Sequence, residues 1–381
     1  METFYTHPLS FNRNIMHKSP TTEMFFELIR LGIGTSDKFN YTPTESEWQE
    51  LFELSRKQAL TGIAFSGIEK LVAAQLPPKQ LLLNWHNYCT QIKLQNYKLD
   101  KLAAKVCENF EKEGFRNSIL KGQGVAQLYE QPTRRIPGDI DIWLEGGNKK
   151  ILDYVKRFVP NCRPVYHHVD FLKLENVDIE VHFTPTWMNS YFTNKKLQRF
   201  FEKESNAQFT HKVTLSNGER ISAPTNIFNR IYILLHIYRH LFQEGIGLRQ
   251  LLDYYYVLKQ GFTKEEKEAT LEQLKEFKML RFTGATMYVL KRVFNIDDAY
   301  LLTSPLEKEG AFLLEEILEA GNFGKYSSRY KNEMSNSLIK RAISKSAHHF
   351  LFIGSYPSET LWGPLFRTWH YFYKKRLISK L

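Results

Sequence analysis

The sequence has few cysteines, no long apolar run and no recognisable secretory leader. Only three cysteines occur in 381 residues, Cys89, Cys107 and Cys162, and their spacing matches no metal-binding motif. This scarcity favours a reducing compartment, so we expect a cytoplasmic protein without a disulfide framework. No run of about 18 apolar residues is present and the mean hydropathy is -0.41, so we expect no transmembrane segment. Residues 1–7 contain neither a basic nor a continuous apolar stretch, so no secretory signal is expected.

Apolar and aromatic side chains are plentiful, at 43% and 14% of the sequence, so the chain can bury a sizeable core. Its length exceeds the size at which one hydrophobic core usually keeps growing, and we expect two or three packed units. The formal charge is +11, and much of the excess lies beyond Phe323, where Lys and Arg far outnumber the acids Glu333 and Glu359. This basic C-terminal region either binds an anionic partner or forms a solvated surface with no single partner.

The periodicity of apolar residues predicts an α+β fold in which a small mixed β-sheet lies between helical regions. Residues 23–96 and 93–113 show helical spacing, whereas 115–120 and 139–144 are typical of strands. Residues 165–174 and 177–183 predict a β-hairpin that turns at Glu175-Asn176. Further helices are expected at 122–129, 149–159, 226–242, 248–260, 264–278, 282–294, 305–320 and 336–352, after a loose leader at 1–20. We therefore expect a helical N-terminal region (1–95), an α/β core (96–225) and a helical C-terminal domain (226–381).

Three short segments of the expected core carry the residues with the clearest chemistry. Lys121-Gly122-Gln123-Gly124 forms a glycine turn after a strand, and Asp139-Ile140-Asp141 and Ile179-Glu180-Val181-His182 lie on two other strands. Because alternate side chains of a strand point the same way, Asp139 and Asp141 would share one face. Glu180 would join them if the two strands are neighbours. Three close carboxylates repel one another unless a cation intervenes, and Mg²⁺ prefers such oxygen ligands.

A lone Asp-x-Asp pair is most often a solvated strand face, but the preceding glycine turn and the third acid favour a metal-dependent nucleotide site here. With these segments the chain resembles the polymerase-β-type nucleotidyltransferase superfamily. More narrowly, it resembles an uncharacterised bacterial nucleotidyltransferase family that has Leu-Lys-Gly, an Arg four residues before Asp-Ile-Asp, and a later acid-x-His. Leu120-Lys121-Gly122, Arg135, Asp139-Ile140-Asp141 and Glu180-Val181-His182 match in that order, and the segments 248–253 and 321–324 are also similar.

The resemblance implies a nucleotidyltransferase core and a catalytic site made of Asp139, Asp141 and Glu180. These acids would bind Mg²⁺, or Mn²⁺, while an acceptor hydroxyl attacks the α-phosphorus of a nucleoside triphosphate such as ATP. The nucleotide would contact a second set of residues: Lys121, Gly122, Gly124 and Arg135. The chain departs from the superfamily pattern at Gln123, where Gly or Ser is usual, and at Glu180, where Asp is commoner.

Several of these residues have an alternative structural interpretation. Lys121 can solvate the end of a strand and Arg135 can be an ordinary loop charge, whereas His182 is interpreted as a supporting residue behind the carboxylates. On the helix expected at 226–242, His236 and His240 lie one turn apart, and Arg249 and Asp253 repeat that spacing on the next helix. Zinc binding, packing between core and helical domain, and substrate contact all remain open for these four residues.

The leading hypothesis is a metal-dependent transferase that moves a nucleoside monophosphate to an unidentified acceptor, which could be a small molecule, a protein or an RNA. The departures at Gln123 and Glu180 favour a second hypothesis, a catalytically inactive nucleotide-binding or interaction protein. The aromatic and basic tail, from Trp362 to Arg376, favours a third, association with a membrane or a polyanion. The same tail can equally be a C-terminal helix that docks on its own protein.

Overall fold

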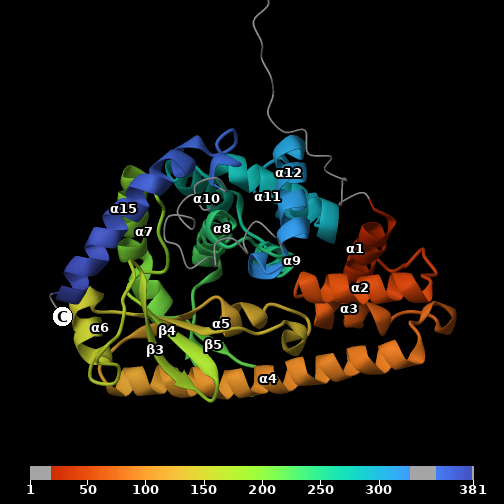
Figure 1. The fold of residues 1–381 in the computed structure, drawn as a ribbon, viewed down its shortest axis with the longest axis horizontal. Helices are drawn as coiled ribbons and strands as arrows, with labels where there is room; N and C mark the ends of the chain where they lie inside the picture. Colours follow the sequence, from red (N-terminus) through yellow and green to blue (C-terminus); the bar gives the residue numbers. More distant parts are fainter. Residues whose placement is uncertain (1–18, 327–348, 380–381) are drawn as a thin grey trace, which may run out of the picture.

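The computed structural model describes residues 19–326 and 349–379, and its fold is mixed α+β, as the sequence predicts. A small sheet lies on one long helix, with N-terminal helices at one end and C-terminal helices above it (Figure 1). Most of the expected leader (1–20) and most of the helix expected at 336–352 fall outside the described residues. None of the described helices is both long and apolar enough to cross a membrane.

The N-terminal region consists of α1 (Pro20–Gly32), α2 (Glu45–Lys57) and α3 (Thr61–Ile68). A capping box starts α2: the Thr44 side chain accepts a hydrogen bond from the Glu47 backbone, and the Glu47 side chain accepts one from the Thr44 backbone. Glycines let α1 and α3 cross in backbone contact, because a Cβ atom added to Gly32 would lie 2.4 Å from the Ile63 carbonyl oxygen. These helices therefore pack more closely than larger residues would allow.

Helix α4 (Lys79–Lys112) is longer than the helix expected at 93–113 and connects two hydrophobic cores. Its 34 residues span about 51 Å at 1.5 Å per residue. Trp85 packs in the core of the helical regions, whereas Val106 and Phe110 pack beneath the sheet. The boundary expected between residues 95 and 96 lies inside this continuous helix, and the three-part division stays a prediction.

The sheet has the strand order β1 (Asn117–Leu120), β2 (Ile140–Leu144), β4 (Val177–His182) and β3 (His168–Leu174). Strands β2 and β4 are parallel, and the two outer pairs are antiparallel, so the sheet is mixed. The expected hairpin turns where predicted, since Glu175 and Asn176 have φ values of 50° and 66°. Two consecutive residues with positive φ are the signature of a tight type I′ hairpin turn.

The two faces of the sheet are chemically different. Ile140, Ile142 and Val181 pack against α4 and α6 (Gly147–Val155). The opposite face carries Asp141, Trp143, Glu180 and His182, and its Trp143 stacks on Phe228 of α8 (Asn226–Gln243). Strand alternation thus places the polar residues of β2 and β4 on the side that faces the C-terminal helices.

The remaining elements are mostly helices. They are α5 (Gly122–Ala126), α7 (Tyr191–Thr210), the small hairpin of β5 (Lys212–Thr214) and β6 (Arg220–Ser222), α9 (Leu248–Lys259), α10 (Lys264–Glu276), α11 (Leu280–Phe294), α12 (Glu307–Ala320) and α15 (Pro357–Ser379). Short 3-10 turns lie at Ala73–Gln75, Pro132–Arg134, Asp298–Tyr300 and Asn322–Gly324. The sequence did not predict the β5–β6 hairpin, and α5 is shorter than the helix expected at 122–129.

Candidate nucleotide and metal site

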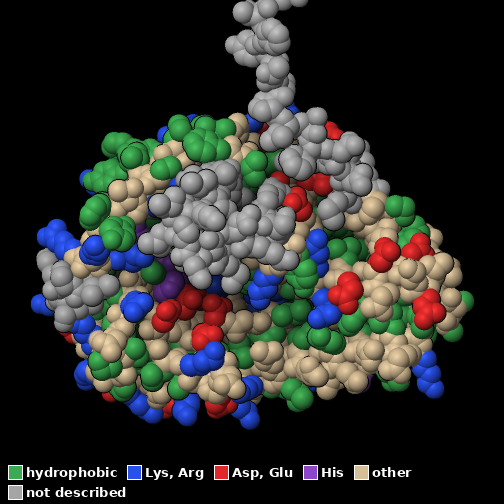
Figure 2. All heavy atoms as spheres, in the orientation of Figure 1, with side chains coloured by type: hydrophobic (Ala, Val, Ile, Leu, Met, Phe, Trp, Pro, Cys, Tyr) green, Lys and Arg blue, Asp and Glu red, His purple; other side chains and the backbone are tan. Residues whose placement is uncertain are grey.

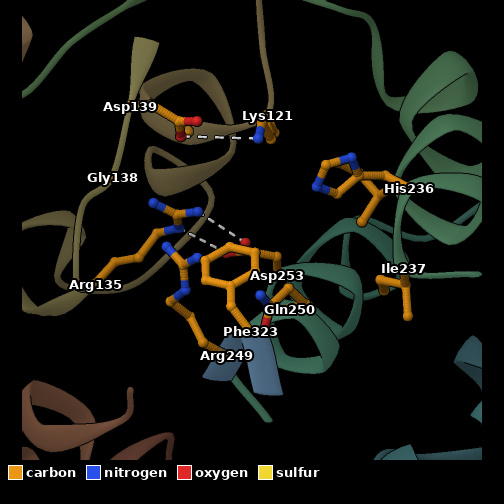
Figure 3. A pocket seen from close by; sticks show the side chains of 12 residues that line it. Lys121, Arg135, Gly138, Asp139, His236, Ile237, Arg249, Gln250, Asp253 and Phe323 are labelled. Carbon is orange, nitrogen blue, oxygen red and sulfur yellow. Dashed lines mark hydrogen bonds and ion pairs between the residues drawn. The ribbon is translucent and has the colours of Figure 1, made fainter. Parts of the chain in front are cut away.

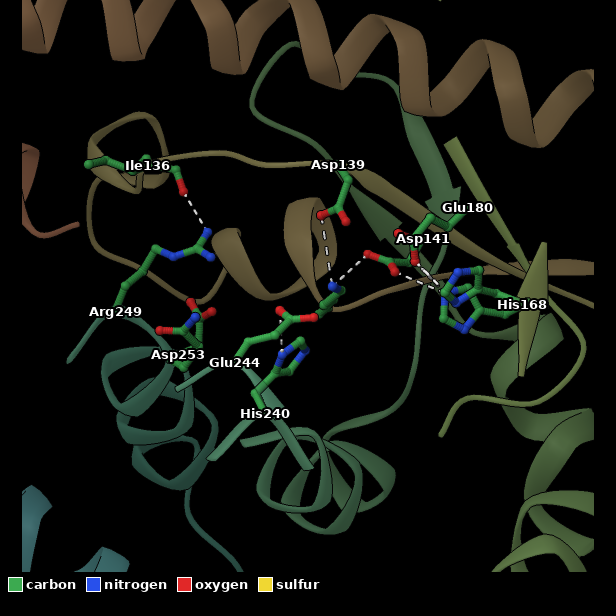
Figure 4. A network of polar contacts seen from close by, with 12 residues as sticks. Ile136, Asp139, Asp141, His168, Glu180, His240, Glu244, Arg249 and Asp253 are labelled. Carbon is green, nitrogen blue, oxygen red and sulfur yellow. Dashed lines mark hydrogen bonds and ion pairs between the residues drawn. The ribbon is translucent and has the colours of Figure 1, made fainter. Parts of the chain in front are cut away.

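The glycine turn after β1 brings Lys121 to the carboxylates. Both Lys121 and Gly122 have a φ of 47°, a left-handed conformation that a lysine rarely adopts. This turn places Lys121 Nζ 2.8 Å from Asp141 Oδ2 and 3.8 Å from Asp139 Oδ1 (Figure 4). The Lys121 side chain is only 17% exposed, so its charge is held largely by these two partners.

The structure brings the three predicted carboxylates together. Asp141 and Glu180 are direct Cα partners across the parallel strands β2 and β4, and Asp139 lies just before β2. One ligand atom from each of the three residues lies within 4.8 Å of the others. Asp141 is buried and Asp139 is exposed, with Glu180 between these extremes. Figure 2 shows acidic side chains gathered near the middle of one face, beside a histidine and between Lys and Arg side chains.

His182 is the hydrogen-bonding partner of these acids. Its Nε2 atom lies 2.9 Å from Asp141 Oδ1 and 3.5 Å from Glu180 Oε2. Burial alone would raise the pKa of Asp141, but Lys121 and the His182 hydrogen bond outweigh it and hold that pKa below its usual range. Burial likewise opposes ionisation of Glu180, yet its electrostatic interactions with the His182 and His168 rings lower its pKa to about 2. Both acids are therefore anionic at neutral pH.

Gln123 and Gly124 of the turn have packing roles that the sequence did not reveal. The Gln123 side chain is buried and donates a hydrogen bond to Asp100 of α4, away from the carboxylates. A Cβ atom at position 124 would lie 2.8 Å from the Ala223 Cβ atom, so Gly124 is needed for close packing against the segment after β6. Gln123 thus connects the glycine turn to α4 through a buried contact.

Arg135 is held by an ion pair that the sequence did not predict. Its Nε and an Nη atom lie 2.7 Å and 2.8 Å from the two carboxylate oxygens of Asp253 on α9, and Tyr129 donates a third hydrogen bond to Asp253. Burial alone would lower the pKa of Arg135, but Asp253 raises it above the usual value. Arg135 therefore fastens the loop before β2 to the C-terminal helices, and its buried Nη1 atom has no hydrogen-bond partner within the described part of the chain.

A small pocket of about 20 Å³, partly open to solvent, lies next to Lys121 and Asp139 (Figure 3). Its far wall includes His236 of α8, Arg249 of α9 and Phe323. The Arg249 guanidinium lies 5.6 Å from the centre of the Phe323 ring, and its Nη1 atom donates to the Ile136 carbonyl. Among the described residues, Arg249 forms no ion pair with a carboxylate, so it is the basic residue of this wall with the least compensated charge.

Of the four residues whose roles the sequence left open, Asp253 has a structural partner and Arg249 and His236 line the pocket. The rings of His236 and His240 lie 4.3 Å apart, but neither belongs to a group of three metal-ligating side chains in the described parts of the chain. The described residues therefore provide no third ligand for a zinc ion bound by His236 and His240. Burial lowers the pKa of His236 well below its usual value, so it contributes a neutral ring to the pocket.

The sequence missed His168, which lies on β3 directly opposite His182. Its Nδ1 atom is 3.4 Å from Glu180 Oε2 and 3.0 Å from His167 Nε2. Alternation along the expected hairpin gives no signal for this residue, because the register shifts between Asp170 and Lys173. The polar face of the sheet thus continues beyond the three predicted acids.

Comparison with known proteins agrees with the resemblance read from the motifs. The profile of a family described as "uncharacterised nucleotidyltransferase" matches residues 44–295, about two thirds of the sequence. The chain belongs to this nucleotidyltransferase family. The match includes the glycine turn, the three acids and the Arg135–Asp253 pair. The predicted family is thereby confirmed, whereas bacterial origin and the link to the polymerase-β superfamily stay predictions.

A likeness to a solved structure is more distant. This nucleotidyltransferase family member matches the crystal structure of an antigenic nucleotidyltransferase-like protein from Paracoccidioides brasiliensis at 10% identity and a TM-score of 0.32. The match covers 55% of this chain and 95% of the other. No curated protein matches the sequence.

Proposed function

We propose that this protein transfers a nucleoside monophosphate from a nucleoside triphosphate to a hydroxyl-bearing acceptor, with a divalent cation, in the manner of polymerase-β-type nucleotidyltransferases. The observation that supports this most directly is the convergence of Asp139, Asp141 and Glu180 within 4.8 Å, beside the Lys121 pocket. Three hard oxygen donors fit Mg²⁺ and also accept Mn²⁺. A bound cation would neutralise phosphate oxygens and lower the pKa of the acceptor hydroxyl.

The residues around the acids suit a triphosphate. A side chain at Gly122 would meet only the Asp139 carbonyl oxygen, at 4.0 Å, so the space beside this turn is open to a phosphate group. Lys121 borders that space, and Arg249 faces it across the pocket. We assign the phosphates to Lys121, Gly122 and Arg249, and assign Gly124 and Arg135 to holding the turn and the loop in place around them.

In the proposed reaction the acceptor hydroxyl loses its proton and its oxygen bonds to the α-phosphorus. The bond from the α-phosphorus to the oxygen that bridges to the β-phosphate breaks, and pyrophosphate leaves. The pKa of Glu180, about 2, makes this carboxylate a poor proton acceptor, so we assign it to metal binding and the hydroxyl proton to solvent. His182 keeps Asp141 in position through the hydrogen bond at its Nε2 atom, which also lies 3.5 Å from Glu180 Oε2.

The test uses α-labelled nucleoside triphosphates, ATP first, with Mg²⁺ or Mn²⁺ and cell extract, followed by identification of the labelled acceptor and measurement of pyrophosphate. Asp139→Asn should abolish metal-dependent transfer. Asp178→Asn is the matched control, because Asp178 lies on β4 but is exposed and contacts only Lys173 among the described residues. Unchanged transfer by folded Asp139→Asn would refute the site. Nucleotide binding by the wild type without pyrophosphate release would instead favour the catalytically inactive alternative.

We further propose that helix α15 binds an anionic lipid surface. One face of this helix docks on the protein, where Phe366 stacks on Trp187 and Trp362 contacts Phe192 of α7. The opposite face leaves Leu361, Leu365 and Phe372 mostly exposed in one helical stripe. Figure 2 shows hydrophobic side chains gathered where Figure 1 places α15.

The charges of α15 suit the same partner. Lys374 and Lys375 follow the exposed stripe, and no acidic residue occurs after Glu359. Apolar side chains beside cations are typical of helices that lie in the interface of anionic membranes. The protein should therefore sediment with phosphatidylserine vesicles more than with phosphatidylcholine vesicles, and Leu365→Ser should reduce binding. Equal sedimentation with both vesicles, or RNA binding that competes with the vesicles, would contradict this assignment.

A further inference from the structure

Two histidines on the polar face of the sheet, His168 and His182, approach Glu180. Figure 4 shows His168 on the side of Glu180 away from Asp139. His168 and His182 are Cα partners on the antiparallel strands β3 and β4, so both rings lie on the same face as Glu180. One ligand atom from each of His168, Glu180 and His182 lies within 4.8 Å of the other two. The side chains of His182, His168 and Glu180 are 3%, 18% and 27% exposed, so the group is partly shielded from water.

The histidine rings around Glu180 carry fewer N–H hydrogens than the neighbouring acceptor atoms could take. His182 Nε2 carries at most one hydrogen, and at 2.9 Å that hydrogen goes to Asp141 rather than to Glu180 Oε2 at 3.5 Å. His168 Nδ1 lies 3.0 Å from His167 Nε2, so one of these two nitrogens donates to the other.

Each arrangement of that hydrogen leaves Glu180 Oε2 poorly satisfied. If His168 donates to His167, its hydrogen is not available to Glu180. If His167 donates, the lone pair of His168 Nδ1 faces Glu180 Oε2 at 3.4 Å. A partly buried carboxylate oxygen that faces nitrogen lone pairs is stabilised by a cation. The chemistry of the group therefore points to a metal ion.

The separations between these atoms fit a metal of a particular kind. Ligand atoms about 2.0 to 2.1 Å from a tetrahedral zinc ion lie about 3.3 Å from one another. The distances of 3.4 Å from His168 Nδ1 to Glu180 Oε2 and 3.5 Å from His182 Nε2 to Glu180 Oε2 are close to that value. Two imidazoles and one carboxylate form a ligand set of open zinc sites, which keep a fourth position for water or substrate, whereas Mg²⁺ prefers oxygen ligands alone.

We propose that His168, Glu180 and His182 bind a transition-metal ion of the zinc type, at a site that shares only Glu180 with the three-carboxylate site. Metal binding at His182 Nε2 would move the ring hydrogen to Nδ1, which is buried and has no hydrogen-bond partner among the described residues. Asp170 Oδ1 lies 3.7 Å from the other ring nitrogen of His168, beyond hydrogen-bond distance but close enough to attract a ring whose first nitrogen binds a metal ion. Glu180 belongs to both ligand groups, so an ion in the histidine site holds a carboxylate that the Mg²⁺ site also uses. The inference stands on the geometry of this group and does not require the proposed transfer.

The site is tested with full-length protein that has been stripped with a chelator and then dialysed against Zn²⁺ in the presence of excess Mg²⁺. Elemental analysis should find one zinc ion per chain, and Co²⁺ should give the intense visible absorption of a low-coordinate site. His168→Gln should lower zinc affinity at least about a hundredfold, and Asp170→Asn, whose side chain is 81% exposed and whose loss does not threaten folding, about tenfold.

Asp139→Asn is the control that separates the two sites. It removes a ligand of the three-carboxylate group only, so it should abolish nucleotidyl transfer and leave zinc binding unchanged. The proposal is overturned if the wild type retains no zinc in excess Mg²⁺, or if His168→Gln and Asp170→Asn bind zinc as tightly as the wild type. Because zinc is measured without nucleotide, a failure here is distinguishable from an absence of transferase activity.

Discussion

Replacing Asp141 by asparagine should destabilise the folded protein, whereas the same change at Asp139 should not. Asp141 is 2% exposed and accepts from Lys121 at 2.8 Å and from His182 at 2.9 Å. Removing one partner of a buried ion pair costs about 3–5 kcal/mol. Lys121 is partly exposed and keeps Asp139 at 3.8 Å, so we expect a loss of about 2–3 kcal/mol for Asp141→Asn. Asp139 is 40% exposed, and its loss should cost less than about 1 kcal/mol.

The assay is urea unfolding in a chelating buffer, with tryptophan fluorescence and circular dichroism as the two signals. A shift of the midpoint at unchanged slope reports the change in the free energy of unfolding. Lys121→Met provides the complementary variant, and the double variant with Asp141→Asn should lose clearly less than the sum of the single losses, because the unpaired charge is gone. Equal losses at Asp139 and Asp141, or additive losses at Lys121 and Asp141, would refute the view that Lys121 neutralises a buried Asp141. The outcome also decides which acid gives the cleaner catalytic test.

Three other features give further predictions. Arg135→Ala and Asp253→Ala should each cost about 3–5 kcal/mol of stability, and a double-mutant cycle by urea unfolding should show strong coupling; additive losses would contradict the buried pair. Burial raises the pKa of Glu359 from 4.5 to about 7, so in that window the folded chain holds a proton that the unfolded chain has lost. The free energy of unfolding should therefore fall by up to about 3 kcal/mol as pH rises, and Glu359→Gln should flatten this dependence; an unchanged profile would contradict it. Gly124→Ala should cost about 1–3 kcal/mol, and Ala223→Gly should restore the loss in thermal unfolding; a wild-type melting curve for Gly124→Ala would contradict the close packing.

Local patterns predicted the elements that carry the acids. Alternation placed Asp141 and Glu180 on one face, because buried Ile and Val residues fill the other face of the same strands. The turn at Glu175-Asn176 could be predicted because Asn tolerates the left-handed conformation that a tight hairpin requires. Family membership followed from the same motifs, and the profile match confirms it.

Features that depend on contacts between distant segments were not predictable from local patterns. Counting back from the hairpin turn would place Val169 opposite His182, but an irregularity between Asp170 and Lys173 shifts the register and brings His168 there instead. The partner of Arg135 lies 118 residues away on α9, so no local pattern indicates it. Such pairings arise only when the sheet and the C-terminal helices pack together.

Because α4 is one continuous helix, only insertions of certain lengths fit within it. Trp85 belongs to the core of the helical regions and Val106 to the core beneath the sheet, and both lie on this one helix. Each residue of a helix turns the chain by about 100°, so inserting a single residue between these positions would swing one core out of line with the other. Insertions close to whole turns, such as seven residues, would preserve the alignment. The distance between the N-terminal helices and the carboxylate site can therefore change only in steps of about two helical turns.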